Sequence, residues 1–253
     1  MILKAIIHTI SPQLNQCQLS FREREPIDIA LANRQHNAYC DMLRRWGLEV
    51  IELSANRQYP DSVFVEDNAV VVDEVAIICR MGAESRRGEV EAIEAELSKY
   101  RQTVRLNAPA TLEGGDVLRM GKKIFVGQTA RSNDAGIRAL SEIVSPYGYR
   151  VIPVAVSGCL HLKSACTALN DVTIMANPQW FDPAPFQEYK IVTVPEEEPE
   201  AANVLQIGDV VCMMENFPQT VRRVKELGYR VDTIDISELL KAEAGLTCSS
   251  IIF

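Results

Sequence analysis

The 253-residue chain is 47% hydrophobic and 24% charged, which is typical of a soluble globular protein, and its formal net charge is −8. The acidic balance argues against nucleic-acid backbone binding, which requires a basic surface. No window approaches the roughly 20 apolar residues of a membrane-spanning helix. The start of the chain, MILKAIIHTISPQ, does not resemble a signal peptide, so we expect a cytoplasmic protein without membrane contact.

A turn followed by a β-rich segment recurs along the chain. The five segments are residues 47–53, 102–106, 148–154, 189–194 and 228–234. A helix is expected before each of them, because apolar residues precede them at helical spacing, as in residues 85–100.

After each of the first four β-rich segments, a polar loop leads into two apolar strands joined by a tight turn. The predicted turns are Asp73-Glu74, Gly121-Lys122, Asn170-Asp171 and Gly208-Asp209. Residues 247–253 begin a fifth such pair but stop after its first strand, and residues 1–10 supply the missing strand. The sequence therefore predicts five α/β units, each with a helix, closed into a ring about a pseudo-fivefold axis. An ordinary α/β sandwich with coincidental internal similarity is the alternative.

If the units are equivalent, the loops that enter the hairpins point to one end of the axis. These loops carry the notable polar side chains of the sequence: Glu66, Asp67, Glu113, Asp116, His161, Lys163, Asn203 and Cys248. A thiol, an imidazole and several carboxylates are thus expected to meet at one axial site.

Only three histidines compete for the role of acid or base. His8 lies in an apolar strand and is expected in the core. His36 lies in a helical stretch beside Gln35 and Asn37 and is expected at the surface. His161 occupies one of the axial loops and is therefore the candidate.

The seven cysteines form no CxxC pair, so neither a disulfide framework nor a structural zinc site is predicted. Cys79 and Cys212 stand in apolar runs and are expected to be buried as small core residues. Cys248 differs, because it lies among small polar residues in an axial loop. A thiolate attacks carbon electrophiles, and the neighbouring carboxylates favour a planar cation such as a guanidinium. The residues alone therefore suggest thiolate attack on a guanidinium carbon.

Seven ordered blocks of sequence resemble the dimethylarginine dimethylaminohydrolase family, within the superfamily of arginine deiminases and amidinotransferases. They are PDSVFVEDNAVV, ESRRGEV, LEGGDVL, VGQTARSN, CLHLKSACTAL, AANVL and GLTCSSIIF. The resemblance implies a five-bladed, pentein-like α/β propeller, and we expect residues 1–253 to form one catalytic domain.

The resemblance also implies the roles of individual residues. Cys248 matches the nucleophile, His161 the general acid and base, and Glu113 the carboxylate that orients His161. Asp67 matches the residue that binds the unsubstituted guanidino nitrogens, assisted by Glu66.

The remaining matches concern the amino-acid end of a substrate. Arg86 and Arg131 match positions that hold its α-carboxylate, and Asp61 matches a contact to its α-amino group. Leu19 and Ala242 match positions that offer backbone contacts from the lid and the C-terminal loop.

The implied reaction converts an Nω-methylated arginine to citrulline and methylamine or dimethylamine, without a metal or organic cofactor. Arginine deiminase-like members have a second aspartate two residues after the histidine, where this chain has Lys163, so a methylated substrate is favoured. Ser249 stands where relatives often show a second cysteine.

Two alternatives remain at this point. One is an enzyme of the same mechanism, including a deiminase or an amidinotransferase, that acts on another guanidino compound. The other is a non-catalytic guanidinium-binding protein, although binding alone requires neither a thiol nor an imidazole. A small-molecule guanidino substrate is the expected partner, and the sequence leaves open a homodimer.

Overall fold

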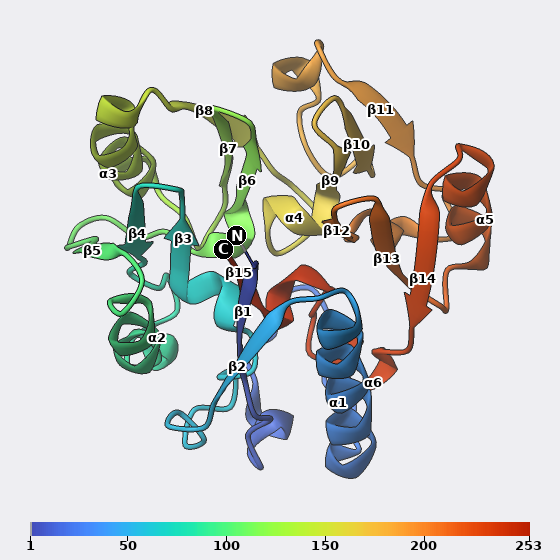
Figure 1. The fold of residues 1–253 in the computed structure, drawn as a ribbon, viewed down its shortest axis with the longest axis horizontal. Helices are drawn as coiled ribbons and strands as arrows, with labels where there is room; N and C mark the ends of the chain where they lie inside the picture. Colours follow the sequence, from blue (N-terminus) through green and yellow to red (C-terminus); the bar gives the residue numbers. More distant parts are fainter. Residues whose placement is uncertain (1) are drawn as a thin grey trace.

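The computed structural model describes residues 2–253, and within them five three-stranded sheets surround a common centre (Figure 1). In every sheet the middle strand pairs antiparallel with one neighbour and parallel with the other. The sheets are β15-β1-β2, β3-β4-β5, β6-β7-β8, β9-β10-β11 and β12-β13-β14. The fold is therefore the predicted five-bladed α/β propeller.

The strands are short, and the β-rich segments of the sequence all form the third strand of a sheet. Their bounds are β1 Lys4–His8, β2 Glu49–Leu53, β3 Ala69–Val71, β4 Val75–Ile78, β5 Gln102–Arg105, β6 Val117–Met120, β7 Lys123–Gln128, β8 Arg150–Ala155, β9 Cys166–Asn170, β10 Thr173–Ala176, β11 Lys190–Thr193, β12 Leu205–Ile207, β13 Val210–Met214, β14 Arg230–Ile234 and β15 Ile251–Ile252. The turn between β9 and β10 lies at residues 171–172, one position later than predicted.

The longer helices lie around the outside of the ring, whereas the short α4, Leu162–Ala165, lies near its centre (Figure 1). Those preceding a third strand are α1 Ile29–Arg45, α2 Val90–Leu97, α3 Asp134–Val144 and α5 Pro218–Glu226, and the short α6 spans Ser237–Leu240. Side-chain caps fix two of their starts: the Asp28 carboxylate accepts from the backbone of Ala30 and Leu31, and Asn133 caps α3. Within residues 2–253, no helix has the length and apolar character needed to cross a membrane.

The helix expected in the fourth unit is missing, and that prediction was wrong. Before β11 the chain forms only a 3₁₀ turn, Ala184–Phe186, because the prolines of this stretch interrupt helical hydrogen bonding. Aromatic packing takes the helix's place: the ring of Phe186 stacks on that of Phe125 with centroids 4.1 Å apart, and Phe181 meets Phe186 edge-on.

Two other expectations needed correction. The predicted helix of residues 85–100 begins only at Val90, because a 3₁₀ turn, Glu84–Arg86, occupies its start. His36 is 3% exposed, whereas the sequence predicted a surface position. The buried side of α1 accepts polar residues, because its side chains find polar partners there: Gln35 donates hydrogen bonds to Asp235 and Ser237. His8 is fully buried, as predicted.

The two ends of the chain pair with each other and close the ring. β1 and β15 run antiparallel, with Ala5 opposite Ile252 and Ile6 opposite Ile251. The backbone N–H of Lys4 donates to Phe253 at 2.8 Å, and that of Phe253 donates to Lys4 at 3.0 Å. The predicted junction of residues 1–10 with residues 247–253 is confirmed for the part of the chain from residue 2 onward.

The hydrophobic core lies between the sheets and the outer helices. The middle strands β4, β10 and β13 are buried along their whole length, which explains why they read as continuous apolar runs. Cys79 and Cys212 are among the buried residues, as predicted.

We predict that Ile6→Ala lowers the free energy of unfolding by about 2 to 5 kcal/mol, because the side chain is fully buried at the ring junction. Urea unfolding monitored by circular dichroism would measure the change. Ile2→Ala is the control: that side chain is 68% exposed, and its loss should change stability by less than about 0.5 kcal/mol. Equal effects of the two substitutions would contradict a contribution of this junction to the stability of the fold.

Candidate active site

A short helical turn stands directly before the first strand of each sheet. The five turns are η2 Val65–Asn68, η4 Gly114–Asp116, α4 Leu162–Ala165, η7 Pro199–Ala202 and η8 Thr247–Ser249. Neighbouring turns pack against one another: η2 contacts η4 and η8, and α4 contacts η4 and η7. The polar loops of the sequence therefore meet at one end of the ring.

A small cavity of ≈ 20 Å³ lies at this end, room for about one water molecule. Several residues expected at the site line it, namely Cys248, His161, Asp67, Arg86, Arg131, Asp61 and Ala242. Sequence reasoning did not single out its other lining residues, Gln18, Phe64, Leu160, Glu243 and Ala244. Phe64, Leu160 and Ala244 are apolar, and Gln18 and Glu243 lie outside the polar loops that enter the hairpins, so no sequence pattern marked them.

His161 and Glu113 form a buried charged pair. The His161 Nε2 lies 2.8 Å from a carboxylate oxygen of Glu113, which is fully buried behind the cavity rather than lining it. Glu113 also accepts a hydrogen bond from the backbone of Gly82 at 3.0 Å and one from Arg131 at 3.3 Å. The pair holds the imidazole ring by one nitrogen and leaves Nδ1 on the side of Asp67.

The electrostatics favour an imidazolium ion at neutral pH. Burial alone would lower the pKa of His161, but the charges of Asp67, Asp116 and Glu113 outweigh it and raise the pKa to about 9. Burial would likewise raise the pKa of Glu113, but the hydrogen bond from His161 and the nearby arginines bring it down to about 2.

Asp67 lies between His161 and Arg86. One carboxylate oxygen accepts a hydrogen bond from the backbone N–H of Gly115 at 3.1 Å and lies 3.9 Å from His161 Nδ1, and the other is 2.7 Å from Arg86. Gly115 must lack a side chain, because a Cβ there would lie 2.6 Å from the His161 ring and 2.8 Å from the Asp67 carboxylate.

Arg86 is held by a second carboxylate that sequence reasoning missed. Glu89, 1% exposed, accepts hydrogen bonds from Arg86 Nε at 3.1 Å and from Nη2 at 3.0 Å. Its place three residues after Arg86 was the only signal in the sequence, and the same spacing is common among surface ion pairs. The bidentate contact fixes the guanidinium plane at the cavity wall.

Cys248 is the half-buried cysteine of the chain, and the backbone N–H of Gly245 lies 3.3 Å from its sulfur. Burial is the main cause that raises its pKa to about 12, and the charges of Glu66 and Asp67 add to it. The group is therefore a thiol at neutral pH, and a cation bound beside these carboxylates would favour the thiolate.

Glu66 does not line this cavity, in contrast to the expectation that it faces the site. Its carboxylate pairs with the ammonium group of Lys163 and accepts a hydrogen bond from Thr247 at 2.7 Å. The same three residues line a separate cavity along the axis, of ≈ 340 Å³. Glu66 and Lys163 thus lie behind the thiol and act on it through charge.

Asp61 and Leu19 belong to the entrance. Asp61 accepts a hydrogen bond from the backbone N–H of Gln18 at 3.0 Å, and burial raises its pKa. The side chain of Leu19 packs against the core and does not line the cavity, and its neighbour Gln18 does.

One group of side chains has the spacing of a metal site. Ligand atoms of Asp67, Glu113 and His161 lie within 4.8 Å of one another. The two carboxylates already have cationic partners, because Arg86 pairs with Asp67 and Arg131 pairs with Glu113, and His161 is bonded to Glu113. A metal ion would have to displace these contacts and deprotonate His161.

Comparison with known proteins identifies the family. The sequence profile described as N,N dimethylarginine dimethylhydrolase, eukaryotic, matches residues 6–175. The N(G),N(G)-dimethylarginine dimethylaminohydrolase of Streptomyces coelicolor is 40% identical over 98% of this chain and 96% of that protein. The chain belongs to the dimethylarginine dimethylaminohydrolase family. The member from Pseudomonas aeruginosa is 36% identical over 89% of this chain and 90% of its own length.

A solved structure from the same family covers the whole chain. It is the Pseudomonas aeruginosa enzyme as a cysteine-to-serine mutant complexed with citrulline, with a TM-score of 0.94, 34% identity and 100% coverage of both chains. The resemblance to dimethylarginine dimethylaminohydrolases that the seven sequence blocks suggested is thereby confirmed.

We predict that His161 retains its proton to about pH 9, whereas Glu113→Gln lowers its pKa because a negative charge and its hydrogen bond are lost. Histidine NMR titration would measure both. His8 and His36 are internal controls, since burial lowers their pKa values, that of His36 to about 4. An unchanged pKa in Glu113→Gln would contradict the role of this pair.

The same shift predicts a pH-dependent contribution to stability. The folded-state pKa of about 9 lies above the ordinary 6.5, so protonation of His161 stabilises the fold fully below about pH 6.5 and ceases to do so as the pH rises to 9. Between these two pH values, the free energy of unfolding of the unmodified chain should fall on the order of 2 to 3 kcal/mol more than that of His161→Gln, as measured by urea unfolding. Parallel pH profiles for the two proteins would contradict the prediction.

Proposed function

We propose that this chain hydrolyses Nω-methylated arginines to citrulline and methylamine or dimethylamine through a covalent intermediate on Cys248. The observation that carries the proposal is that a thiol, an imidazolium and an aspartate line one small cavity. The complex of the Pseudomonas aeruginosa relative with citrulline supports this choice of product.

The substrate enters as a cation and completes the charge balance of the site. Asp67 binds its unsubstituted guanidino nitrogens, while Glu66 adds negative charge from behind without touching the cavity. Burial and the nearby carboxylates raise the pKa of Cys248 to about 12, and the positive charge of the substrate counteracts both, so the thiol loses its proton to solvent only when a substrate is present.

The other end of the substrate is recognised by charge as well. Arg86 and Arg131 line the cavity and bind the α-carboxylate, and Asp61 binds the α-amino group. Leu19 and Ala242 supply backbone groups from opposite sides of the entrance.

Attack by the Cys248 thiolate on the guanidino carbon forms a carbon–sulfur bond and a tetrahedral adduct. His161, protonated at neutral pH, donates its proton to the methylated nitrogen as the carbon–nitrogen bond breaks and the amine leaves. The now neutral imidazole, oriented by Glu113, takes a proton from water, which attacks the amidino carbon. Collapse of this second adduct releases citrulline and returns the thiolate.

Substrate choice follows from Lys163. Its ammonium group pairs with Glu66, at the position where a second aspartate would bind another guanidino nitrogen. With one carboxylate clamp instead of two, plain arginine is held less well and an alkylated nitrogen is accommodated.

We also propose that residues 1–253 act as one catalytic domain, because the ring closes through pairing of its own ends. The formation of a homodimer remains a prediction, which light scattering would test. The alternative of an amidinotransferase differs in that an amine acceptor, in place of water, attacks the amidino-cysteine.

We predict that Cys248→Ser lowers the hydrolysis of methylated arginines at least about 10³-fold while substrate binding persists, since an alkoxide is far harder to form than a thiolate. Citrulline and amine release, measured across arginine and its methylated forms, would test both the reaction and the substrate choice. His161→Gly should permit attack but stall turnover, so mass spectrometry should detect an adduct on Cys248.

Cys159→Ser is a matched control, because that buried thiol lies outside the cavity and donates its S–H to the His161 carbonyl oxygen at 3.3 Å. It should retain most activity. Substantial hydrolysis by Cys248→Ser, or activity that a chelator removes and added metal restores, would overturn the mechanism.

A further inference from the structure

Residues 17–28 lie between η1, Leu14–Gln16, and α1, and form neither helix nor strand. Gln18 in this segment lines the active-site cavity. Because the cavity measures only ≈ 20 Å³, a substrate of amino-acid size enters only if a neighbouring segment moves. This segment has no helix or strand hydrogen bonds to constrain its backbone, which makes it a candidate for that movement.

Within residues 18–22 of this segment, the bonded backbone N–H groups donate to side-chain carboxylates. Asp61 accepts a hydrogen bond from the N–H of Gln18 at 3.0 Å. Glu243 accepts hydrogen bonds from three successive N–H groups, those of Ser20 at 2.9 Å, Phe21 at 2.5 Å and Arg22 at 2.6 Å. Three charge-assisted hydrogen bonds to one carboxylate form a compact anion nest.

The backbone of Glu243 is itself unusual. Its φ angle is +59°, the single positive φ of a non-glycine residue among residues 2–253. Left-handed geometry is uncommon for a residue with a Cβ and is retained where surrounding contacts require it. Ala242 and Ala244, on either side, both line the active-site cavity. Glu243 therefore connects the C-terminal wall of the cavity directly to the segment above it.

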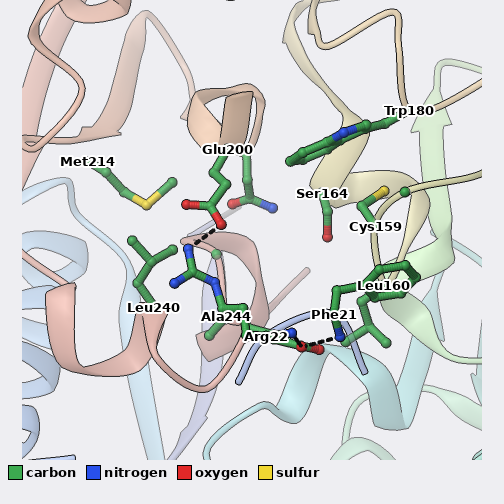
Figure 2. A pocket seen from close by; sticks show the side chains of 14 residues that line it. Phe21, Arg22, Cys159, Leu160, Ser164, Trp180, Glu200, Met214, Leu240 and Ala244 are labelled. Carbon is green, nitrogen blue, oxygen red and sulfur yellow. Dashed lines mark hydrogen bonds and ion pairs between the residues drawn. The ribbon is translucent and has the colours of Figure 1, made fainter. Parts of the chain in front are cut away.

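An ion pair is a second, weaker contact that holds the same segment. The guanidinium of Arg22 pairs with Glu200 beside a cavity of ≈ 170 Å³ that Phe21 and Trp180 also line (Figure 2). The two charged side chains are 28% and 31% exposed, and solvent-exposed pairs of this kind contribute little. The bonds to Glu243 are therefore the main fastening of residues 20–22.

We propose that Glu243 is a positioning residue whose carboxylate holds residues 18–22 closed over the cavity, and so sets the affinity for the amino-acid end of the substrate. The inference rests on the proposed function for the identity of that substrate. Asp61 couples the two events, since the carboxylate that binds the Gln18 N–H also faces the cavity as the α-amino contact. Each turnover then requires the three bonds to open for entry and to re-form around the bound molecule.

The kinetic test is Glu243→Gln, which keeps the size of the side chain and one acceptor oxygen but removes the charge. We expect KM for the methylated arginine to rise about tenfold or more while kcat changes less than about threefold, because the closed form becomes less populated. Glu23→Gln is the matched control: Glu23 is exposed in the same segment and should leave both constants unchanged. A fall in kcat at unchanged KM would overturn the assignment.

The second test needs no substrate. Limited trypsin digestion after Arg22 or Arg24, followed by mass spectrometry, reports how often the segment opens. We expect cleavage about tenfold faster or more in Glu243→Gln and in the shortened Glu243→Asp than in Glu23→Gln. Equal cleavage rates in all three would overturn the inference. If the unmodified chain hydrolyses no guanidino compound, the proposed function fails, and the digestion still decides the role of Glu243.

Discussion

Backbone hydrogen bonds between the two ends of the chain, Lys4 with Phe253, close the ring of sheets. A chain terminus is usually poorly ordered, yet Cys248 lies only five residues from the end. The pairing of β15 with β1 fixes the turn η8 that carries Cys248, and the backbone of Gly245 points an N–H at its sulfur. The same closure brings the loops of the other sheets around the thiol. The site therefore depends on the pairing of β15 with β1, just after the turn η8 in the chain.

The balance of charges around the cavity explains both the stability of the site and the protonation states of its groups. Carboxylates exceed the cations around the cavity, and three of the buried ones form ion pairs: Asp67 with Arg86, Glu113 with His161, and Glu66 with Lys163. Removing a partner from such pairs leaves an uncompensated buried charge, which is strongly unfavourable. The surplus of negative charge keeps His161 protonated, and burial together with that charge keeps Cys248 a thiol. In the mechanism we propose, this arrangement links the formation of the nucleophile to the presence of a guanidinium substrate.

The entrance and the floor of the site are held by different kinds of contact. Its floor consists of helical turns locked between strands, whereas residues 18–22 are held by the carboxylates of Asp61 and Glu243. Side-chain bonds to exposed backbone open at lower free energy than a strand ladder does. In the function we propose, the rigid part of the site carries the reacting groups, and a separate, more easily opened part of the chain covers the substrate.

The sequence by itself determined the five units, the closure of the ring and the candidacy of Cys248 and His161, because strand patterning and turn residues are local features that repeat along the chain. It misjudged the fourth helix, where prolines made aromatic packing the better solution, and the surface position of His36. Only the tertiary structure placed Glu66 behind the cavity with Lys163, joined Glu89 to Arg86 and set Glu243 against residues 20–22. These outcomes depend on which side chains the fold brings within hydrogen-bonding distance, and a charged residue in a sequence carries no mark of its partner.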